Sequence, residues 1–230
     1  MTKLKNLLSK GGVVSLLASV ISIMCGLILG LILLFIFNPP FALSGFLKIF
    51  TTGVADLYNL SKVFYQAAPL IFTGLSVGFA FKTGLFNIGA TGQYTVGAFF
   101  ALVVAIQFQM PWYVALLASM LGGAFWGLFP GLFKALFNVN EVITSIMFNW
   151  IGLFLVNMLL ANMPMLLASY WGAPNADRTA NIAKANPEAL IPTMGLDKLF
   201  NSPYMNISIF IAVIFALIVY VVLNKTTFGY

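Results

Sequence analysis

The most constraining feature of the sequence is a run of 51 residues, between Lys82 and Lys134, that contains no Asp, Glu, Lys or Arg. Soluble domains use about a quarter of their residues for charge, whereas this chain of 230 residues uses 7%. Because the hydrocarbon core of a bilayer is about 30 Å thick, a helix needs about 20 apolar residues to cross it. The charge-free run can hold two such helices and a tight turn, which predicts a polytopic membrane protein.

Composition excludes several classes of function. The hydrophobic fraction is 61%, which is too high for a soluble chain of this length. The net charge is +6, but the basic residues are scattered singly, so we expect no nucleic-acid partner. The chain has no histidine, which removes Ser-His and Cys-His catalysis and imidazole metal sites. We therefore expect no catalytic residue, no metal and no cofactor, and we interpret the small residues of 74–78 as a helix-packing segment.

Charged residues divide the chain into apolar windows, and these windows predict an all-α bundle of about six transmembrane helices in a single membrane domain over 1–230. The second span is expected to be short and interrupted by Gly74 and Gly78. The predicted spans are 13–37, 67–83, 92–109, 111–133, 142–162 and 205–223.

The orientation is predicted from the lysines before the first span. Lys3, Lys5 and Lys10 favour a cytoplasmic N-terminus, because cytoplasmic loops are enriched in basic residues. Two predicted spans precede the turn at Lys82 and four precede Lys134, so both lysines are placed on the cytoplasmic side as well.

Two segments between spans are expected to lie outside the membrane core. The segment 41–62 has apolar residues at helical spacing and predicts an amphipathic helix on the outer interface. The segment 163–204 is the one long loop, with five prolines and mixed charges, and we expect it to be extracytoplasmic. Such a loop is either a docking surface for an external partner or a plain linker. The apolar face of 41–62 consists of Leu43, Phe46, Leu47, Phe50, Val54, Leu57 and Tyr58.

The residues 84–93 are expected to break the helical pattern, because they contain three glycines. A break at membrane depth leaves backbone polar groups unpaired, and it is tolerated only where protein or a water-filled cavity surrounds them. Transporters use such breaks to build substrate sites. The alternative is a tight cytoplasmic turn between two spans, capped by Asn87.

A second polar cluster follows Lys134. Asn140 and Glu141 precede an apolar run, and they are interpreted as the cytoplasmic cap of the fifth span, since a carboxylate is stabilised at a helix N-terminus. Asn149 and Asn157 are eight residues apart and close to one face of that span. Amide side chains inside a membrane usually form hydrogen bonds to a neighbouring helix. The alternative interpretation is that these two amides line a path for a solute.

These two clusters carry a resemblance. The runs APLIFTGL (68–75), GLFNIGATGQ (84–93) and NEVITSIMFN (140–149) are similar to the permease subunits of bacterial ABC importers. Among these importers, the sequence most resembles the branch that transports simple sugars, nucleosides and branched-chain amino acids. Within that branch, it is most similar to the nucleoside and simple-sugar permeases. The resemblance extends from about residue 13 to the C-terminus.

The resemblance implies a multi-pass subunit of the bacterial inner or plasma membrane, in contact with membrane lipid, that forms the path for a small polar solute and catalyses no reaction. It also implies a second permease subunit, cytoplasmic ATPase subunits and an extracytoplasmic binding protein or lipoprotein as partners. The path residues expected from the two clusters are Asn87, Gly89, Gly92, Gln93, Asn149 and Asn157.

Family members are longer than this chain, which resembles their N-terminal two-thirds. By this resemblance the helix that docks on the ATPase begins after Tyr230. We therefore expect the 230 residues to insert in a membrane without holding the ATPase.

The main alternative function is a secondary transporter driven by an ion gradient. Such carriers generally hold Asp, Glu or His within their spans, and no predicted span has one at its centre. An intramembrane enzyme is disfavoured, because histidine is absent and no acids are paired.

The predicted orientation is tested by cysteine labelling in intact cells. In a Cys25→Ser background, an impermeant thiol reagent is expected to label Ser169→Cys and Thr193→Cys. Lys82→Cys and Lys134→Cys are expected to stay protected until the membrane is opened. Labelling of Lys134→Cys in intact cells contradicts the orientation.

Overall fold

The computed structural model describes residues 11–174 and 178–226. Within these ranges the chain forms nine α-helices and no strand, and its one β-bridge joins Leu167 to Thr179. This confirms the expected all-α fold with about six spans. Lys3, Lys5 and Lys10, which carry the predicted orientation, lie outside the described residues, as does Tyr230. The stretches long and apolar enough to cross a membrane are Leu16–Phe37, Leu57–Lys82, Ala90–Gln107, Trp112–Phe137, Glu141–Ala161 and Ser208–Lys225.

The described chain forms two compact units, which divide in sequence between Leu60 and Ser61. The first contains α2 (Gly11–Phe37) and α3 (Ala42–Thr51). The α2 helix ends before Pro39 because a residue that precedes proline is pushed out of the helical region, and Asn38 has φ −149° and ψ 69°. No residue in the most apolar window of α2 is buried by protein. Its surface is left for lipid or for another helix, as a membrane span requires.

The boundary between α3 and α4 (Leu57–Lys82) differs from the expected one. The sequence predicts one amphipathic helix over 41–62 and a second span from 67, but α4 starts ten residues before that. The cause is Asp56, whose Oδ1 accepts a hydrogen bond from the backbone N–H of Asn59 at 2.6 Å. Asp is a favoured N-cap residue, so it starts a new helix. An interfacial position for α3 stays a prediction.

The α4 helix is continuous over 26 residues, so the expected short and interrupted second span is wrong. Pro69 lies inside this helix, whereas a span that began at 67 would have placed it near the start. A glycine inside a helix costs only about 1 kcal/mol relative to alanine, which the long apolar segment can offset. A Cβ added at Gly74 or Gly78 meets nothing within 4 Å. The two glycines therefore leave open space beside α4, and the break in the chain comes after Lys82.

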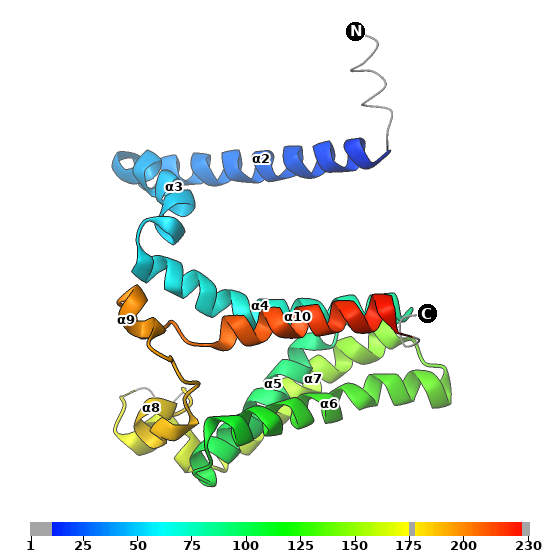
Figure 1. Ribbon diagram of the computed structural model, residues 1–230. Coiled ribbons are helices and arrows are strands. Elements are labelled where there is room, and N and C mark those ends of the chain that lie inside the picture. The colour runs from blue at the N-terminus through cyan, green and yellow to red at the C-terminus, as the bar shows by residue number, and fades with distance from the viewer. Residues whose placement is uncertain (1–10, 175–177, 227–230) are drawn as a thin grey trace. The chain divides into compact units, whose positions relative to one another are not determined.

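Three helices form the packed centre of the second unit. They are α5 (Ala90–Leu102), which continues into a π-helical turn at Val103–Gln107, α6 (Trp112–Phe137) and α7 (Glu141–Ala161). The α5 helix packs against both others (Figure 1). A Cβ at Gly97 would lie 2.8 Å from the backbone oxygen of Ser119, so only glycine permits this approach of α5 to α6.

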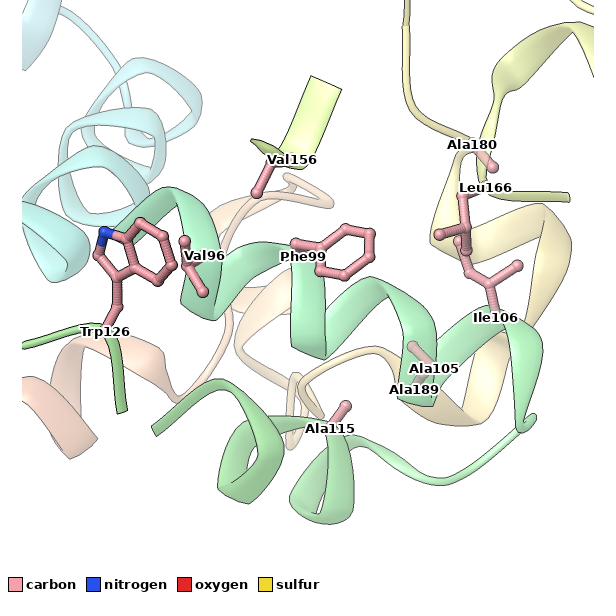
Figure 2. Close-up of a cluster of buried hydrophobic side chains, with 10 residues drawn as sticks. All are labelled: Val96, Phe99, Ala105, Ile106, Ala115, Trp126, Val156, Leu166, Ala180 and Ala189. Carbon is pink, nitrogen blue, oxygen red and sulfur yellow. The ribbon is translucent and has the colours of Figure 1, made fainter. Parts of the chain in front are cut away.

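Buried apolar side chains follow α5 along its length (Figure 2). Trp126 of α6 packs near Val96, and its indole N–H donates to the backbone oxygen of Phe148 at 3.0 Å. This bond satisfies the polar end of a buried aromatic side chain and joins α6 to α7. At the other end of the cluster, Leu166 and Ala180 of the long segment pack near Ile106.

The described residues of the segment 163–204, which are 163–174 and 178–204, pack against the bundle. It contains α8 (Ile182–Ala185) and α9 (Leu196–Phe200). Buried Asn186 donates hydrogen bonds to the backbone oxygens of Ala105 at 2.8 Å and Met110 at 3.0 Å. These bonds anchor the segment to the π-helical turn and to the connection between α5 and α6. Docking of an external partner on this segment stays a prediction.

The α10 helix (Ser208–Lys225) runs beside α4 (Figure 1). The rings of Phe72 and Phe215 meet edge to face with centroids 5.6 Å apart. Near the start of the pair, the hydroxyl of Ser61 donates to that of Ser202 at 2.6 Å, and both residues are buried. Aromatic and hydroxyl contacts of this kind hold helices together where lipid removes the hydrophobic driving force.

Candidate functional site

The site is built on a break between α4 and α5. The helix α4 ends at Lys82, and Gly84 has a positive φ of 79°. The chain then runs without helix to Gly89, which is the N-cap of α5. Glycine adopts the left-handed region without steric cost, so the sequence at Gly84 permits this sharp change of direction. The break therefore contains Gly84 and Gly89, whereas Gly92 and the other residues of 90–93, which were expected to belong to it, lie in α5.

Asn87 closes the break with its side chain. Its Oδ1 accepts from the backbone N–H of Gly89 at 3.0 Å, as in an Asx turn. Its Nδ2 donates to the hydroxyl of Ser76 at 3.2 Å and to Oε1 of Gln93 at 3.3 Å. The Nε2 of Gln93 donates in return to Oδ1 of Asn87 at 3.3 Å. We call Ser76, Asn87 and Gln93 the amide cluster; it joins α4, the break and α5.

Asn149 of α7 holds the other side of the break. Its Oδ1 accepts from the backbone N–H of Gly92 at 2.7 Å, and its Nδ2 donates to the backbone oxygen of Ile88 at 2.9 Å. The first N–H groups of a helix lack partners within the helix, and the N-cap Gly89 has no side chain to supply one. Asn149 therefore caps α5 from a neighbouring helix.

Three cavities adjoin one another along α4, α5 and α6. The lysine cavity, of about 550 Å³, is bounded by Lys134 and Glu141. The central cavity measures about 860 Å³, and the long-loop cavity, beside residues 181–193, about 1100 Å³. The residues shared by the lysine and central cavities are Ser76, Gln93, Ala124 and Gly127. The residues shared by the central and long-loop cavities are Tyr65, Ala101, Ser119 and Ile182.

Among the described residues, none that lines the central cavity is charged. Its polar groups are hydroxyls and one amide, and its apolar surface includes aromatic rings. A small number of placed polar groups in an apolar wall is the usual composition of a site for a small molecule. The hydroxyl and amide residues are Tyr65, Thr73, Ser76, Gln93, Tyr94, Ser119 and Thr179.

Charge appears at the far end of the lysine cavity. The Nζ of Lys134 lies 3.1 Å from Oε2 of Glu141, so the pair joins the last turns of α6 to the first turn of α7. Asn140 is the N-cap of α7, and its Oδ1 accepts from the backbone N–H of Val142 at 2.9 Å. Glu141 therefore lies where the helix dipole favours a negative charge.

The expected path residues occupy different places. Asn87 and Gln93 line the cavities, whereas Gly89 and Gly92 are buried packing positions. Asn149 contacts the break. Asn157 is exposed on α7 and lines none of these three cavities.

Of the seven hydroxyl and amide residues that line the central cavity, the sequence reasoning expected Gln93 and missed the other six, and two of these six are used in the argument below. Ser76 lies among the small residues of 74–78, which were interpreted as helix packing only. Ser119 of α6 stands in an apolar run without a motif, so no local signal could identify it.

Comparisons with known proteins agree with the sequence resemblance. Residues 59–230 match a family described as branched-chain amino acid transport system, permease component. The chain is 32% identical over 219 residues to the guanosine ABC transporter permease protein NupP of Bacillus subtilis, which covers 94% of this chain and 60% of NupP. No solved structure matches the chain.

Two further relatives have related names. The glucose ABC transporter permease protein TsgB13 of Haloferax volcanii is 32% identical over 187 residues, 79% of this chain and 48% of TsgB13. The nucleoside ABC transporter permease protein NupB of Lactococcus lactis is 31% identical over 223 residues, 93% of this chain and 58% of NupB. The chain thus spans about half to three-fifths of the length of these relatives.

The close contact at Gly92 generates a stability prediction. A Cβ there would lie 2.9 Å from Oδ1 and 3.0 Å from Cα of Asn149, and 3.0 Å from the backbone oxygen of Phe148. Because backbone atoms cannot move aside, Gly92→Ala is expected to lower stability by about 1–3 kcal/mol. The measurement is the thermal unfolding midpoint of the protein purified in detergent. Gly78→Ala is the control, since its Cβ meets nothing within 4 Å. Equal midpoints for the two variants contradict the packing argument.

Proposed function

This chain belongs to the family of permease components of branched-chain amino acid transport systems, and on that premise we propose that it forms the translocation path of an ATP-driven importer for a small, neutral, polar solute. The proposed path runs through the long-loop, central and lysine cavities. Its proposed lining includes Asn87 and Gln93, which were expected from the sequence, together with Ser76 and Ser119. Gly89, Gly92 and Asn149 support the path by packing and hydrogen bonding.

The observation that carries the proposal is the uncharged polar lining of the central cavity. A charged solute needs a counter-charge when it leaves water, because burying an unpaired charge is costly. A neutral solute with several hydroxyl groups needs only hydrogen-bond partners, and the hydroxyls and the Gln93 amide offer them. Rings such as those of Tyr65, Phe72 and Tyr94 can also cover the flat face of a sugar or a base.

Nucleosides and simple sugars are the proposed solutes. Both are neutral and rich in hydroxyl groups, which suits the lining of the central cavity. The names of the relatives NupP, NupB and TsgB13 refer to guanosine, nucleosides and glucose. A branched-chain amino acid, which is zwitterionic, fits this lining less well.

The proposed partners are a second permease subunit, cytoplasmic ATPase subunits and an extracytoplasmic binding protein. Within its 230 residues the sequence has no G-x-x-x-x-G-K-[ST] run, the loop that cradles nucleotide phosphates in many ATPases. ATP hydrolysis is therefore assigned to another subunit. We place the lysine cavity on the cytoplasmic side, in line with the predicted orientation.

An ion-coupled carrier is the less favoured function. Among the described spans, the one acidic residue is Glu141, and Lys134 neutralises it at the start of α7. No acid or histidine remains at the centre of a described span to bind a coupling ion.

A charge placed in the central cavity tests the proposal. Ser119→Asp introduces a carboxylate where the path is uncharged, and it is expected to lower the initial rate of solute uptake by about tenfold or more, because charge at membrane depth is costly to accommodate. Uptake of radiolabelled guanosine and glucose is measured in cells that produce the full-length permease with its partner subunits, at matched membrane abundance.

Ser208→Asp is the matched control for this substitution. Ser208 begins α10 and lines none of the three cavities, and a helix start accepts a carboxylate. Unchanged uptake is expected for this control. Equal uptake by both variants contradicts a path through the central cavity.

A further inference from the structure

We propose that the amide cluster of Ser76, Asn87 and Gln93 is a closed gate between the central and lysine cavities, and that Asn149 is the positioning residue that holds this gate closed. The inference rests on the proposed path and adds how passage along it is controlled.

The gate is located by the residues that the two cavities share. Ala124 and Gly127 contribute little or no side chain, so the wall between the cavities consists mainly of Ser76 and Gln93. A Cβ at Gly127 would lie 3.0 Å from Nε2 of Gln93, so the Gln93 amide lies directly against α6. On its other side, Oε1 of Gln93 accepts from the hydroxyl of Ser76 at 3.4 Å. One amide group therefore bridges the space between α4 and α6.

Asn87 fixes the Gln93 amide in this position. The two side chains exchange hydrogen bonds in both directions, each of 3.3 Å. These lengths are beyond the usual range for N–H···O bonds, so they are weak bonds that a small displacement can break. The bond from Asn87 Nδ2 to Ser76 is slightly shorter, at 3.2 Å. Release of Asn87 would free the Gln93 amide to swing away from α4.

Asn149, which is a residue of α7, connects the amide cluster to that helix. Its bonds to Gly92 and Ile88, at 2.7 and 2.9 Å, are shorter than any bond within the cluster. Ile88 is next to Asn87 in the chain, so a shift of α7 displaces Asn87 before it breaks the bonds of Asn149. The first turn of α7 is itself joined to α6 by the pair of Lys134 and Glu141. A movement of α7 relative to α6 is thereby transmitted to the gate.

The gate is tested by cysteine modification, which requires no knowledge of the solute. Membrane vesicles contain the chain with its partner subunits in a Cys25→Ser background. The probe is the charged, impermeant reagent 2-(trimethylammonium)ethyl methanethiosulfonate, applied only from the face that labels Ser169→Cys. Ser119→Cys reports on the central cavity, and Thr83→Cys reports on the lysine cavity. With the gate closed, Ser119→Cys is expected to react quickly and Thr83→Cys slowly.

Asn87→Ala is expected to raise the modification rate of Thr83→Cys by about tenfold, because it removes the hydrogen bonds that hold the Gln93 amide. The rate for Ser119→Cys and the membrane abundance are expected to stay unchanged. An unchanged rate for Thr83→Cys overturns the gate.

Asn149→Ala is expected to raise the Thr83→Cys rate in the same way, since the residue acts through Asn87. The double variant with Asn87→Ala is then expected to react no faster than Asn87→Ala alone. Asn162→Ala is the matched control at the C-terminal end of α7, because its exposed amide donates to the backbone oxygen of Met158 within the same helix. Additive effects of the two variants, or an equal effect of the control, overturn the positioning role.

The outcomes for the gate and for the proposed function can be told apart. If Ser119→Cys reacts slowly from both faces, the central cavity is not open to water and the proposed path itself is wrong. If the gate behaves as expected but Ser119→Asp leaves uptake unchanged, the constriction exists and the solute takes another route.

Discussion

The cap that Asn149 provides for α5 is the interaction on which the site depends. The non-helical segment between α4 and α5 leaves backbone N–H and C=O groups without partners inside a helix. Here the N-cap residue is Gly89, which has no side chain, and the amide of Asn149 satisfies Gly92 N–H and Ile88 C=O together. One side chain of α7 thus supplies hydrogen-bond partners to the segment that joins two candidate spans.

The rest of the site follows from that break. Because the chain leaves the helix at Lys82 and resumes at Ala90, Asn87 can turn its amide back toward Ser76 and Gln93. Gly84 permits the change of direction, and Gly89 and Gly92 let the start of α5 approach α7 closely. Tight packing of α5 against α6 and α7 contrasts with the open space beside Gly74 and Gly78 of α4. The central cavity lies between the close-packed helices and the more loosely packed α4.

Much of the fold could be predicted from the sequence, because charged residues and helix caps mark the ends of membrane spans. The predicted end of the first span at residue 37, the gap in charge after Lys82 and the Asn140 cap all coincide with observed helix ends. The start of α4 could not be placed, because the cap Asp56 lies inside an amphipathic pattern that continues across it. Gly74 and Gly78 misled the prediction, since glycine spacing alone does not distinguish an interrupted helix from a continuous one.

The site was predictable only in part, for a physical reason. Asn87 and Gln93 stand in a glycine-rich motif, so a local signal exists for them. Ser119 has no such motif, and its role depends on the arrangement of α4, α5 and α6 in space. The anchoring of the long segment by Asn186 also joins residues far apart in sequence, which no pattern within 163–204 indicates.

The central claim is that the uncharged cavity conducts a neutral polar solute, and competition for uptake tests it most directly. Cells that lack their own uptake systems produce the full-length permease with its partner subunits. The entry of labelled guanosine, glucose and leucine is then measured with each unlabelled compound in excess. The expected result is saturable entry of guanosine or glucose. Excess unlabelled leucine is expected not to reduce this entry. Entry of leucine alone, unaffected by either neutral solute, would contradict the central claim.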